Sequence, residues 1–163
     1  MRRATVAVLA FLCALAALLA PQAFAAPLHP QLNITGYVIN ADLDPATNKI
    51  SATADVTFTA LEDLTSATFE LNNGLNITQL TDTANQTLPS ERIAANSTVR
   101  VTLPAPIAKG SVNTFHFVYS GALVGAATSP VEGIKFAAIA DPISILLYPG
   151  AWFPLQTPGL FTD

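Results

Sequence analysis

The sequence is poor in the residues that metal and thiol chemistry require. It holds one cysteine, Cys13, and two histidines, His29 and His116. Cys13 lies in an apolar N-terminal run, so the rest of the chain has no thiol for a disulfide, for catalysis or for a metal. The H-E-x-x-H zinc motif and the G-x-S-x-G turn are both absent. We therefore assign no catalytic residue, no metal ligand and no cofactor to this chain itself.

Charged residues are also scarce, at 11% of the chain, and the 11 acidic residues outnumber the 7 basic ones. Beyond Arg3 the basic residues stand singly, so the sequence lacks the basic patch that nucleic acids bind. We expect no nucleic-acid partner. His116 stands alone between Phe115 and Phe117, and we expect it to be a surface or hydrogen-bonded residue. An enzyme built around His116 is the least favoured hypothesis.

The first 25 residues are typical of an export signal. Arg2 and Arg3 precede an apolar run over residues 4–20, and Ala23-Phe24-Ala25 forms an A-x-A cleavage site. The run is at the short end for a membrane span, which makes an uncleaved anchor the weaker alternative. We predict a helical signal peptide over 1–25 that is cleaved after Ala25. The remaining chain would be secreted or periplasmic, with no stable membrane insertion.

Alternation of apolar and polar residues dominates residues 26–163, which we expect to form one domain. Period-two alternation places one set of side chains in a core and the other in water. Short strands at close spacing, without an amphipathic helix between them, predict an all-β fold: an antiparallel β-sandwich or saddle-like domain. The predicted strands are Asn33–Leu43, Lys49–Ala60, Ser66–Asn72, Leu75–Thr81, Ile93–Leu103 and Ser111–Tyr119.

Turn residues separate these strands. The tight turn Asn72-Asn73-Gly74 predicts that the third and fourth strands pair as a hairpin. The segments 82–92 and Pro104-Ala105-Pro106 are predicted separators. From Gly121 onward, Pro and Gly interrupt the chain every few residues, so that 134–139, 143–148 and 151–155 are expected to be loops or short edge strands. The aromatic side chains on the strands are expected to be core residues.

Two segments carry a resemblance to a known family. Residues 37–71 read YVINADLDPATNKISATADVTFTALEDLTSATFEL, with Y-x-I-x-A-x-L-D-P before the turn and an alternating strand after it. This sequence pattern resembles the N-terminal region of aminopeptidase N-type zinc metallopeptidases, peptidase family M1. A second segment, from Ser129-Pro130 through Tyr148 to Ala151-Trp152-Phe153-Pro154, is similar to the place where that family's N-terminal domain reaches its catalytic domain.

The resemblance implies an N-terminal domain whose catalytic domain is absent from this chain. It also implies that the last strands of the sandwich are missing at the C-terminal end. The implied partners are the catalytic domain of the same polypeptide, which would hold the zinc, and a peptide substrate. The parent protein would remove N-terminal residues from peptides, and this domain would restrict access to the catalytic cleft.

For the site itself, the resemblance implies a substrate-binding or domain-interface role for Tyr148, Trp152 and Phe153, with packing at the domain junction favoured over lining a pocket. Relatives place a Gln and a Glu nearby to bind the substrate's amino end. This chain has Ile143 and Ile145 in that region, so that role does not carry over. The alternative is a stand-alone secreted β-sandwich that binds peptide, glycan or protein through residues 148–161.

Overall fold

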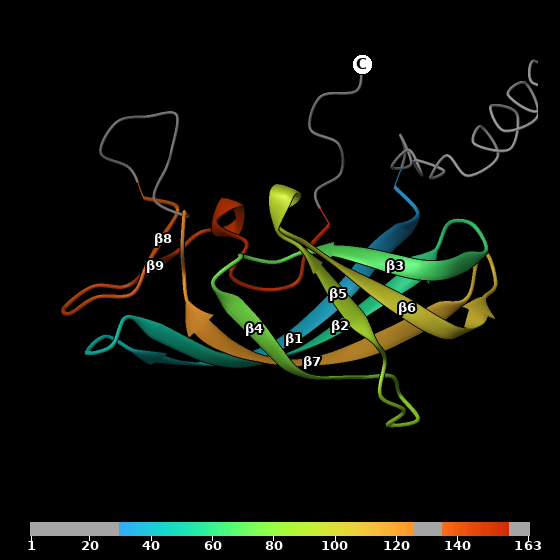
Figure 1. Cartoon of the computed structure of the whole chain (residues 1–163), viewed down its shortest axis with the longest axis horizontal. Coiled ribbons are helices and arrows are strands. Elements are labelled where there is room, and N and C mark those ends of the chain that lie inside the picture. Colours follow the sequence, from blue (N-terminus) through green and yellow to red (C-terminus); the bar gives the residue numbers. More distant parts are fainter. Residues whose placement is uncertain (1–29, 126–134, 157–163) are drawn as a thin grey trace, which may run out of the picture.

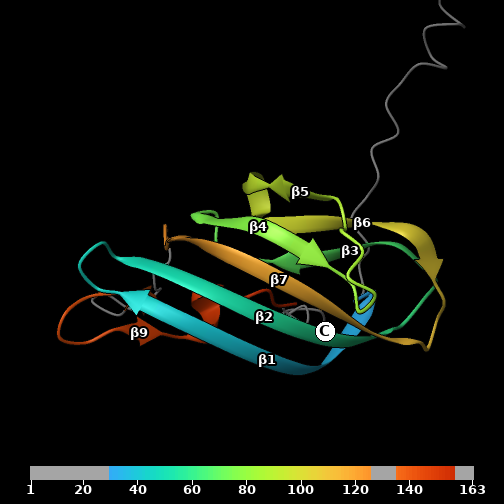
Figure 2. The ribbon, with the colours of Figure 1, turned by 90° about the horizontal axis from the view of Figure 1, so that it is seen from below.

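Two antiparallel sheets packed face to face make up most of the structure, a computed structural model that describes residues 30–125 and 135–156 (Figure 1). In the first sheet the strand order is β1-β2-β7-β4, and in the second it is β3-β6-β5. Figure 2 shows the first sheet with its four strands side by side, β1 at one edge and β4 at the other. The predicted all-β sandwich is confirmed.

The first sheet starts from the hairpin of β1 (Leu32–Asp44) and β2 (Lys49–Ala60). At its turn, the Asp44 carboxylate accepts hydrogen bonds from the Thr47 hydroxyl (2.6 Å) and the Ala46 N–H (3.0 Å), and Asn48 takes a left-handed φ of 55°. The Thr47 hydroxyl is the main reason why the pKa of Asp44 is lowered. β7 (Val112–Ala122) then inserts between β2 and β4 (Leu75–Thr81).

Alternate residues of both sheets fill the core between them. On β2, every second residue from Ile50 to Ala60 is buried, and the residues between face outward. Four phenylalanines pack edge-to-face at the centre, with centroid separations between 4.9 and 6.1 Å: Phe58, Phe69, Phe115 and Phe117. The prediction that the strand aromatics are core residues is confirmed for these four.

The predicted hairpin of the third and fourth strands is wrong. β3 (Leu64–Glu70) pairs with β6 in the second sheet, and β4 pairs with β7 in the first. The Asn72 carboxamide oxygen does accept the Gly74 N–H (3.0 Å), so a tight turn forms. That turn leads the chain from β3 in the second sheet to β4 in the first. Asn72 is buried there, and its side chain is hydrogen-bonded to Val124 and Gly150, far along the chain.

The second sheet also departs from the prediction. β5 (Ser90–Ile93) lies in the expected loop 82–92 apart from its last residue, and it pairs with β6 (Thr98–Ile107), so the predicted strand Ile93–Leu103 is wrong at its start. A 3-10 turn, η1 (Ala94–Asn96), joins the two strands. Pro104 and Pro106 do not end β6 as expected. They lie where the register between β3 and β6 shifts, a position at which the missing proline N–H is tolerated.

Short elements follow β7, as predicted. β8 (Ala137–Ala138) and β9 (Ile145–Leu146) form a small hairpin, and η2 (Tyr148–Gly150) leads into the last described segment. No helix within the described ranges is long and apolar enough to cross a membrane. The predicted signal, with Ala23 and Ala25, and the Ser129-Pro130 pair lie outside the described residues.

Candidate functional site

The three aromatic residues predicted from the sequence meet on one side of the sandwich. Phe153 is buried, and its ring packs edge-to-face against Trp152 and Tyr148, with centroids 4.7 and 6.2 Å away. A fourth ring joins them from β1, where Tyr37 lies 5.1 Å from Phe153. We call Tyr37, Tyr148, Trp152 and Phe153 the aromatic cluster. Trp152 is half-buried, while Tyr37 and Tyr148 remain exposed at the surface.

The cluster is apolar in character despite its two hydroxyls. Burial, and then the neighbouring Tyr148, raise the pKa of the Tyr37 hydroxyl above its ordinary value of about 10, at which a phenol is already neutral at physiological pH. The Tyr148 hydroxyl donates a hydrogen bond to the Gln156 carbonyl oxygen (3.3 Å). The arrangement therefore suits contact with an apolar or aromatic surface that also offers a hydrogen-bonding group at its rim.

The segment that carries the cluster is joined to the second sheet by backbone hydrogen bonds. The Glu70 N–H donates to the Leu155 carbonyl oxygen (2.7 Å), and the Leu155 N–H donates back to Glu70 (3.0 Å). The Leu155 side chain is buried in the core. These contacts extend the second sheet by one short segment beyond β3, which holds Trp152 and Phe153 against the sandwich.

A buried asparagine fixes the start of the same segment. Asn72 is 6% exposed, and its side-chain amide donates to the carbonyl oxygens of Val124 (2.9 Å) and Gly150 (3.3 Å). Its side-chain oxygen accepts from the N–H groups of Val124 and Gly74, both at 3.0 Å. The Asn72 backbone N–H also donates to the Ala151 carbonyl oxygen (2.8 Å). One side chain thus ties the sheet crossing, the end of β7 and η2 together.

Close packing makes glycine necessary at the end of η2. A Cβ on Gly150 would lie 2.7 Å from the Cβ of Ala137, so only glycine lets η2 approach β8 this closely. The next residue, Ala151, takes a left-handed φ of 46° and ends the turn. The backbone of η2 therefore fixes the positions of Tyr148 and Trp152 relative to the β8–β9 hairpin.

An exposed apolar strip continues from the cluster along β9. Its members are Ile143, Ile145, Leu147 and Tyr148, whose exposure ranges from 41% to 69%. Leu146 points the other way and packs against the core, so β9 presents apolar side chains on both faces. A strand of this kind is normally covered on both sides. We call these four residues the apolar strip.

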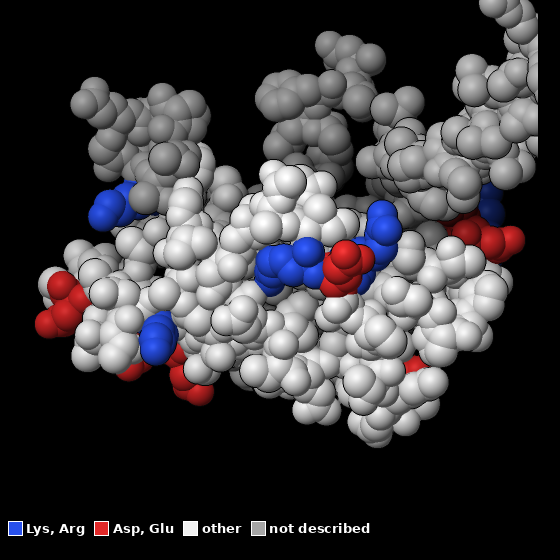
Figure 3. Space-filling model, viewed as in Figure 1, with Lys and Arg blue, Asp and Glu red and all other residues white. Residues whose placement is uncertain are grey.

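Charge is absent from this part of the sequence. No Lys, Arg, Asp or Glu occurs between Asp141 and Asp163. Figure 3 shows how sparsely charged side chains are spread over one face of the domain. Depletion of charge and enrichment in aromatic residues are typical of the buried centre of a protein interface. The sequence analysis did not predict this surface, although the alternation of Ile143, Ile145 and Leu147 is a pattern from which it could have been recognised.

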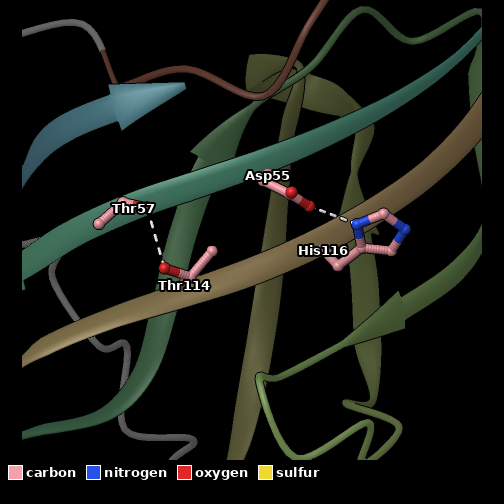
Figure 4. Close-up of polar contacts among 4 residues, drawn as sticks. All are labelled: Asp55, Thr57, Thr114 and His116. Carbon is pink, nitrogen blue, oxygen red and sulfur yellow. Dashed lines mark hydrogen bonds and ion pairs between the residues drawn. The ribbon is translucent and has the colours of Figure 1, made fainter. Parts of the chain in front are cut away.

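The outer face of the first sheet is polar instead. His116 on β7 pairs with the Asp55 carboxylate on β2 through its Nδ1 atom, and beside them the hydroxyls of Thr57 and Thr114 are 2.9 Å apart (Figure 4). His116 is therefore the hydrogen-bonded surface residue that was predicted. Within residues 30–125 and 135–156, no three His, Cys, Asp or Glu side chains gather as metal ligands do.

Hollows in the described surface are shallow. One of about 310 Å³ lies beside η2, between Glu70, Asn73 and Pro149, and one of about 300 Å³ lies on the outer face of the first sheet, near Asp42 and Ser51. Neither is lined by the rings of the aromatic cluster. The geometry at the cluster thus suits contact with another surface better than enclosure of a small ligand.

Comparison with known proteins finds similarity in structure but not in sequence. Neither the protein-family models nor the curated proteins match this sequence. Among solved structures, an M1 zinc metallopeptidase from Deinococcus radiodurans matches 77% of the chain, with a TM-score of 0.62 and 21% identity. A mutant of an M1 zinc metallopeptidase from that organism, bound to a Tyr-Ser-Ala substrate, matches with a TM-score of 0.64 and 20% identity.

A third structure, described as a two-domain M1 zinc metallopeptidase mutant bound to L-tryptophan, matches 80% of the chain with a TM-score of 0.65 and 20% identity. The chain spans only 29% to 31% of the length of these proteins. At this identity the similarity concerns the fold. The resemblance predicted from residues 37–154 is confirmed at that level: the chain has the fold of one part of the M1 zinc metallopeptidases.

Proposed function

We propose that this chain is the non-catalytic N-terminal domain of an M1-type zinc aminopeptidase. One observation carries the proposal: most of the chain matches M1 zinc metallopeptidases in fold while spanning less than a third of their length. The sequence patterns of residues 37–71 and 129–154 support the same assignment. They favour a position for this domain at the N-terminal end of the complete protein. The catalytic domain would lie in the same polypeptide, outside these residues.

In this proposal the apolar strip and the aromatic cluster form the surface that packs on the catalytic domain. Complete burial of one large apolar side chain contributes about 1.5–3 kcal/mol, so the exposed Ile143, Ile145, Leu147 and Tyr148 would stabilise such an interface appreciably. The hydrogen bonds of Asn72 and Leu155 would hold this surface in a fixed orientation. The zinc would be held by the catalytic domain, as the similarity to M1 zinc metallopeptidases implies.

The proposed reaction is the removal of N-terminal residues from peptides. A zinc ion held in the catalytic domain would supply an activated water for attack on the peptide bond. The residues of this chain would act by position. With Tyr148 and Trp152 packed on the catalytic domain, the surface around η2 would form one wall of the cleft and limit which peptide ends can enter. Secretion or export to the periplasm is part of the proposal and rests on residues 1–25 and the cleavage site at Ala23 and Ala25.

The first experiment is to determine the coding sequence beyond Asp163 and to express the complete product. We expect an open frame that encodes H-E-x-x-H, and a protein that hydrolyses amino-acyl anilides, loses activity to a chelator and regains it with zinc. Ile145→Asp should lower that activity, because it places a carboxylate in the interface. Val112→Asp is the matched control, since Val112 is an exposed valine on β7, away from the apolar strip.

A stop codon directly after Asp163 in an expressed gene would contradict the proposal. It would favour the second hypothesis, a stand-alone secreted binding module that uses the same exposed surface for a peptide, glycan or protein. Equal activity of the Ile145→Asp and Val112→Asp proteins would leave the peptidase assignment in place and remove the role of the apolar strip.

A further inference from the structure

One peptide bond in the crossing from β3 to β4 joins an asparagine to a glycine, the pair Asn73-Gly74 (Figure 1). It is the only Asn-Gly pair in the sequence. The Asn73 side chain is exposed, and glycine has no Cβ that would hinder an approach to its backbone nitrogen. An asparagine in this context can react with its own backbone, because its carboxamide carbon and the next backbone nitrogen can close a succinimide ring.

We propose that Asn73 is a site of spontaneous deamidation, and that the hydrogen bond from Gly74 to Asn72 controls its rate. In the first step the Gly74 N–H loses its proton to hydroxide, and the nitrogen attacks the Asn73 carboxamide carbon. The bond from that carbon to the side-chain nitrogen breaks, and ammonia leaves after taking a proton from water. Water then opens the succinimide and gives aspartate or isoaspartate at position 73. Water is the only co-reactant, and nothing is oxidised or reduced.

The hydrogen bond to Asn72 holds the proton that must leave first. The Gly74 N–H donates to the Asn72 side-chain oxygen (3.0 Å), and the Leu75 N–H closes the same turn on the Asn72 carbonyl oxygen (3.0 Å). Asn72 is 6% exposed, so the turn must open before hydroxide can take this proton. Amide hydrogen exchange at Gly74 requires the loss of the same proton. Folding should therefore slow exchange at Gly74 and deamidation at Asn73 by the same factor.

Close packing explains why the crossing contains a reactive pair. A Cβ on Gly74 would lie 1.9 Å from the Ala122 carbonyl oxygen, so the start of β4 requires glycine where it passes the end of β7. Asn73 makes one side-chain hydrogen bond, from its amide to the Ala94 carbonyl oxygen of η1 (2.9 Å). The glycine is thus fixed by the fold, and protection of the pair depends on Asn72.

Deamidation would change the crossing in two ways. Isoaspartate adds one atom to the main chain between Asn72 and Gly74, which moves the Gly74 N–H away from the Asn72 side chain. A carboxylate at position 73 also loses the donor to the Ala94 carbonyl oxygen, and it shares the hollow beside η2 with Glu70. We expect the bonds from Asn72 to η2 to loosen as a result, so the modification would weaken the support of the aromatic cluster. This effect does not depend on the peptidase assignment.

The test is incubation of the complete 163-residue chain at mildly alkaline pH, with a parallel sample unfolded in urea. Peptide mass spectrometry locates the modification. We expect deamidation at Asn73 in both samples, slower at least about tenfold in the folded chain, and we expect exchange at the Gly74 amide to be slowed by the same factor within about threefold. Asn73→Gln should abolish modification at this position, because its longer side chain closes a larger ring far more slowly.

Two destabilised variants separate local opening from global unfolding. Asn72→Ala removes the acceptor of the Gly74 N–H, whereas Leu64→Ala leaves a cavity in the core at the far end of β3. We expect Asn72→Ala to accelerate deamidation of the folded chain at least about tenfold, and Leu64→Ala less than about twofold. If Asn72→Ala does not fold, the agreement between Gly74 exchange and Asn73 deamidation in the unmodified sequence still tests the proposal.

Each part of the proposal has an outcome that would overturn it. An unmodified Asn73 in the unfolded sample would exclude the site, and equal rates in the folded and unfolded samples would exclude protection by the turn. Equal acceleration by Asn72→Ala and Leu64→Ala would show that global unfolding sets the rate. In the isoaspartate form, separated by chromatography, exchange at Gly150 and Ala151 should be faster by roughly tenfold, about the equivalent of one hydrogen bond; unchanged exchange there would exclude the effect on η2.

Discussion

Asn72 links the apolar strip to the core, and its replacement by alanine tests whether one buried amide positions that surface. The substitution removes the four side-chain hydrogen bonds to Val124, Gly150 and Gly74. The neighbouring Asn73 provides the control: it is exposed, and its side chain makes one hydrogen bond, to the Ala94 carbonyl oxygen (2.9 Å).

The expected magnitude follows from burial. A hydrogen bond contributes about 0.5–1.5 kcal/mol to stability, and each partner left unsatisfied in the interior adds a further cost. Four such bonds at a site that is 6% exposed indicate a loss of about 3–5 kcal/mol for Asn72→Ala. Asn73→Ala should cost less than about 1 kcal/mol, because water replaces its single exposed bond.

Urea denaturation of the complete chain measures both losses, and hydrogen exchange locates the effect. In the Asn72→Ala protein, we expect faster exchange at the amides of Gly150 and Ala151, which η2 protects. The core strands should remain protected whenever the variant is folded. Equal losses for Asn72→Ala and Asn73→Ala, or unchanged exchange around η2, would refute the reasoning.

Three further predictions concern stability. Tyr119→Phe should raise the free energy of unfolding by about 1 kcal/mol in urea, because the Tyr119 hydroxyl is buried without a hydrogen-bond partner among the described residues; a loss of that size would show that a partner exists. Because the pKa of Tyr37 is raised in the folded state, this residue contributes stability that is complete below about pH 10, the ordinary tyrosine value, and is lost as the pH rises toward the raised folded value. The free energy of unfolding, measured from about pH 8 to 11.5, should therefore decline with pH, and the decline should be weaker in Tyr37→Phe. An identical decline in both proteins would contradict this. Gly150→Ala should cost about 1–3 kcal/mol by thermal denaturation, because its Cβ would meet Ala137 at 2.7 Å, whereas Gly36→Ala, with open space around it, should cost less.

The strands that could be predicted are those whose pattern is local. β2 and β4 occupy the expected residues, and β1 differs by one residue at each end. Alternation is visible in sequence because each strand buries every second side chain in one core. The fold class follows from the same pattern.

The errors arose where long-range contacts decide the structure. Asn72 looks like an ordinary turn residue in sequence, but its partners Val124 and Gly150 lie 52 and 78 residues away, and they turn a predicted hairpin into a crossing between sheets. β5 contains the charged pair Glu91 and Arg92, and it became a strand because β6 offers it a free edge. The Arg92 guanidinium also donates to the carbonyl oxygens of Leu71 (2.7 Å) and Leu75 (2.5 Å), another link that spacing does not reveal.

The candidate site was partly predictable. Tyr148, Trp152 and Phe153 stood out as aromatics in a charge-free segment, and they do lie together. Tyr37 could not be assigned to them, because its contact with Phe153 spans most of the domain. Their role at a substrate cleft or a domain junction stays a prediction.

The central place of β7 has a consequence for synthesis. β7 is the last long strand to be made, yet both β2 and β4 need it as their neighbour. At about 5–20 residues per second, the β1–β2 hairpin would wait roughly 3–12 s after Ala60 before β7 is complete at Ala122. An isolated hairpin is only marginally stable, so the nascent chain stays open until most of the domain has emerged from the ribosome. Folding is thus postponed by strand order, which leaves a period in which chaperones can bind the unfolded chain.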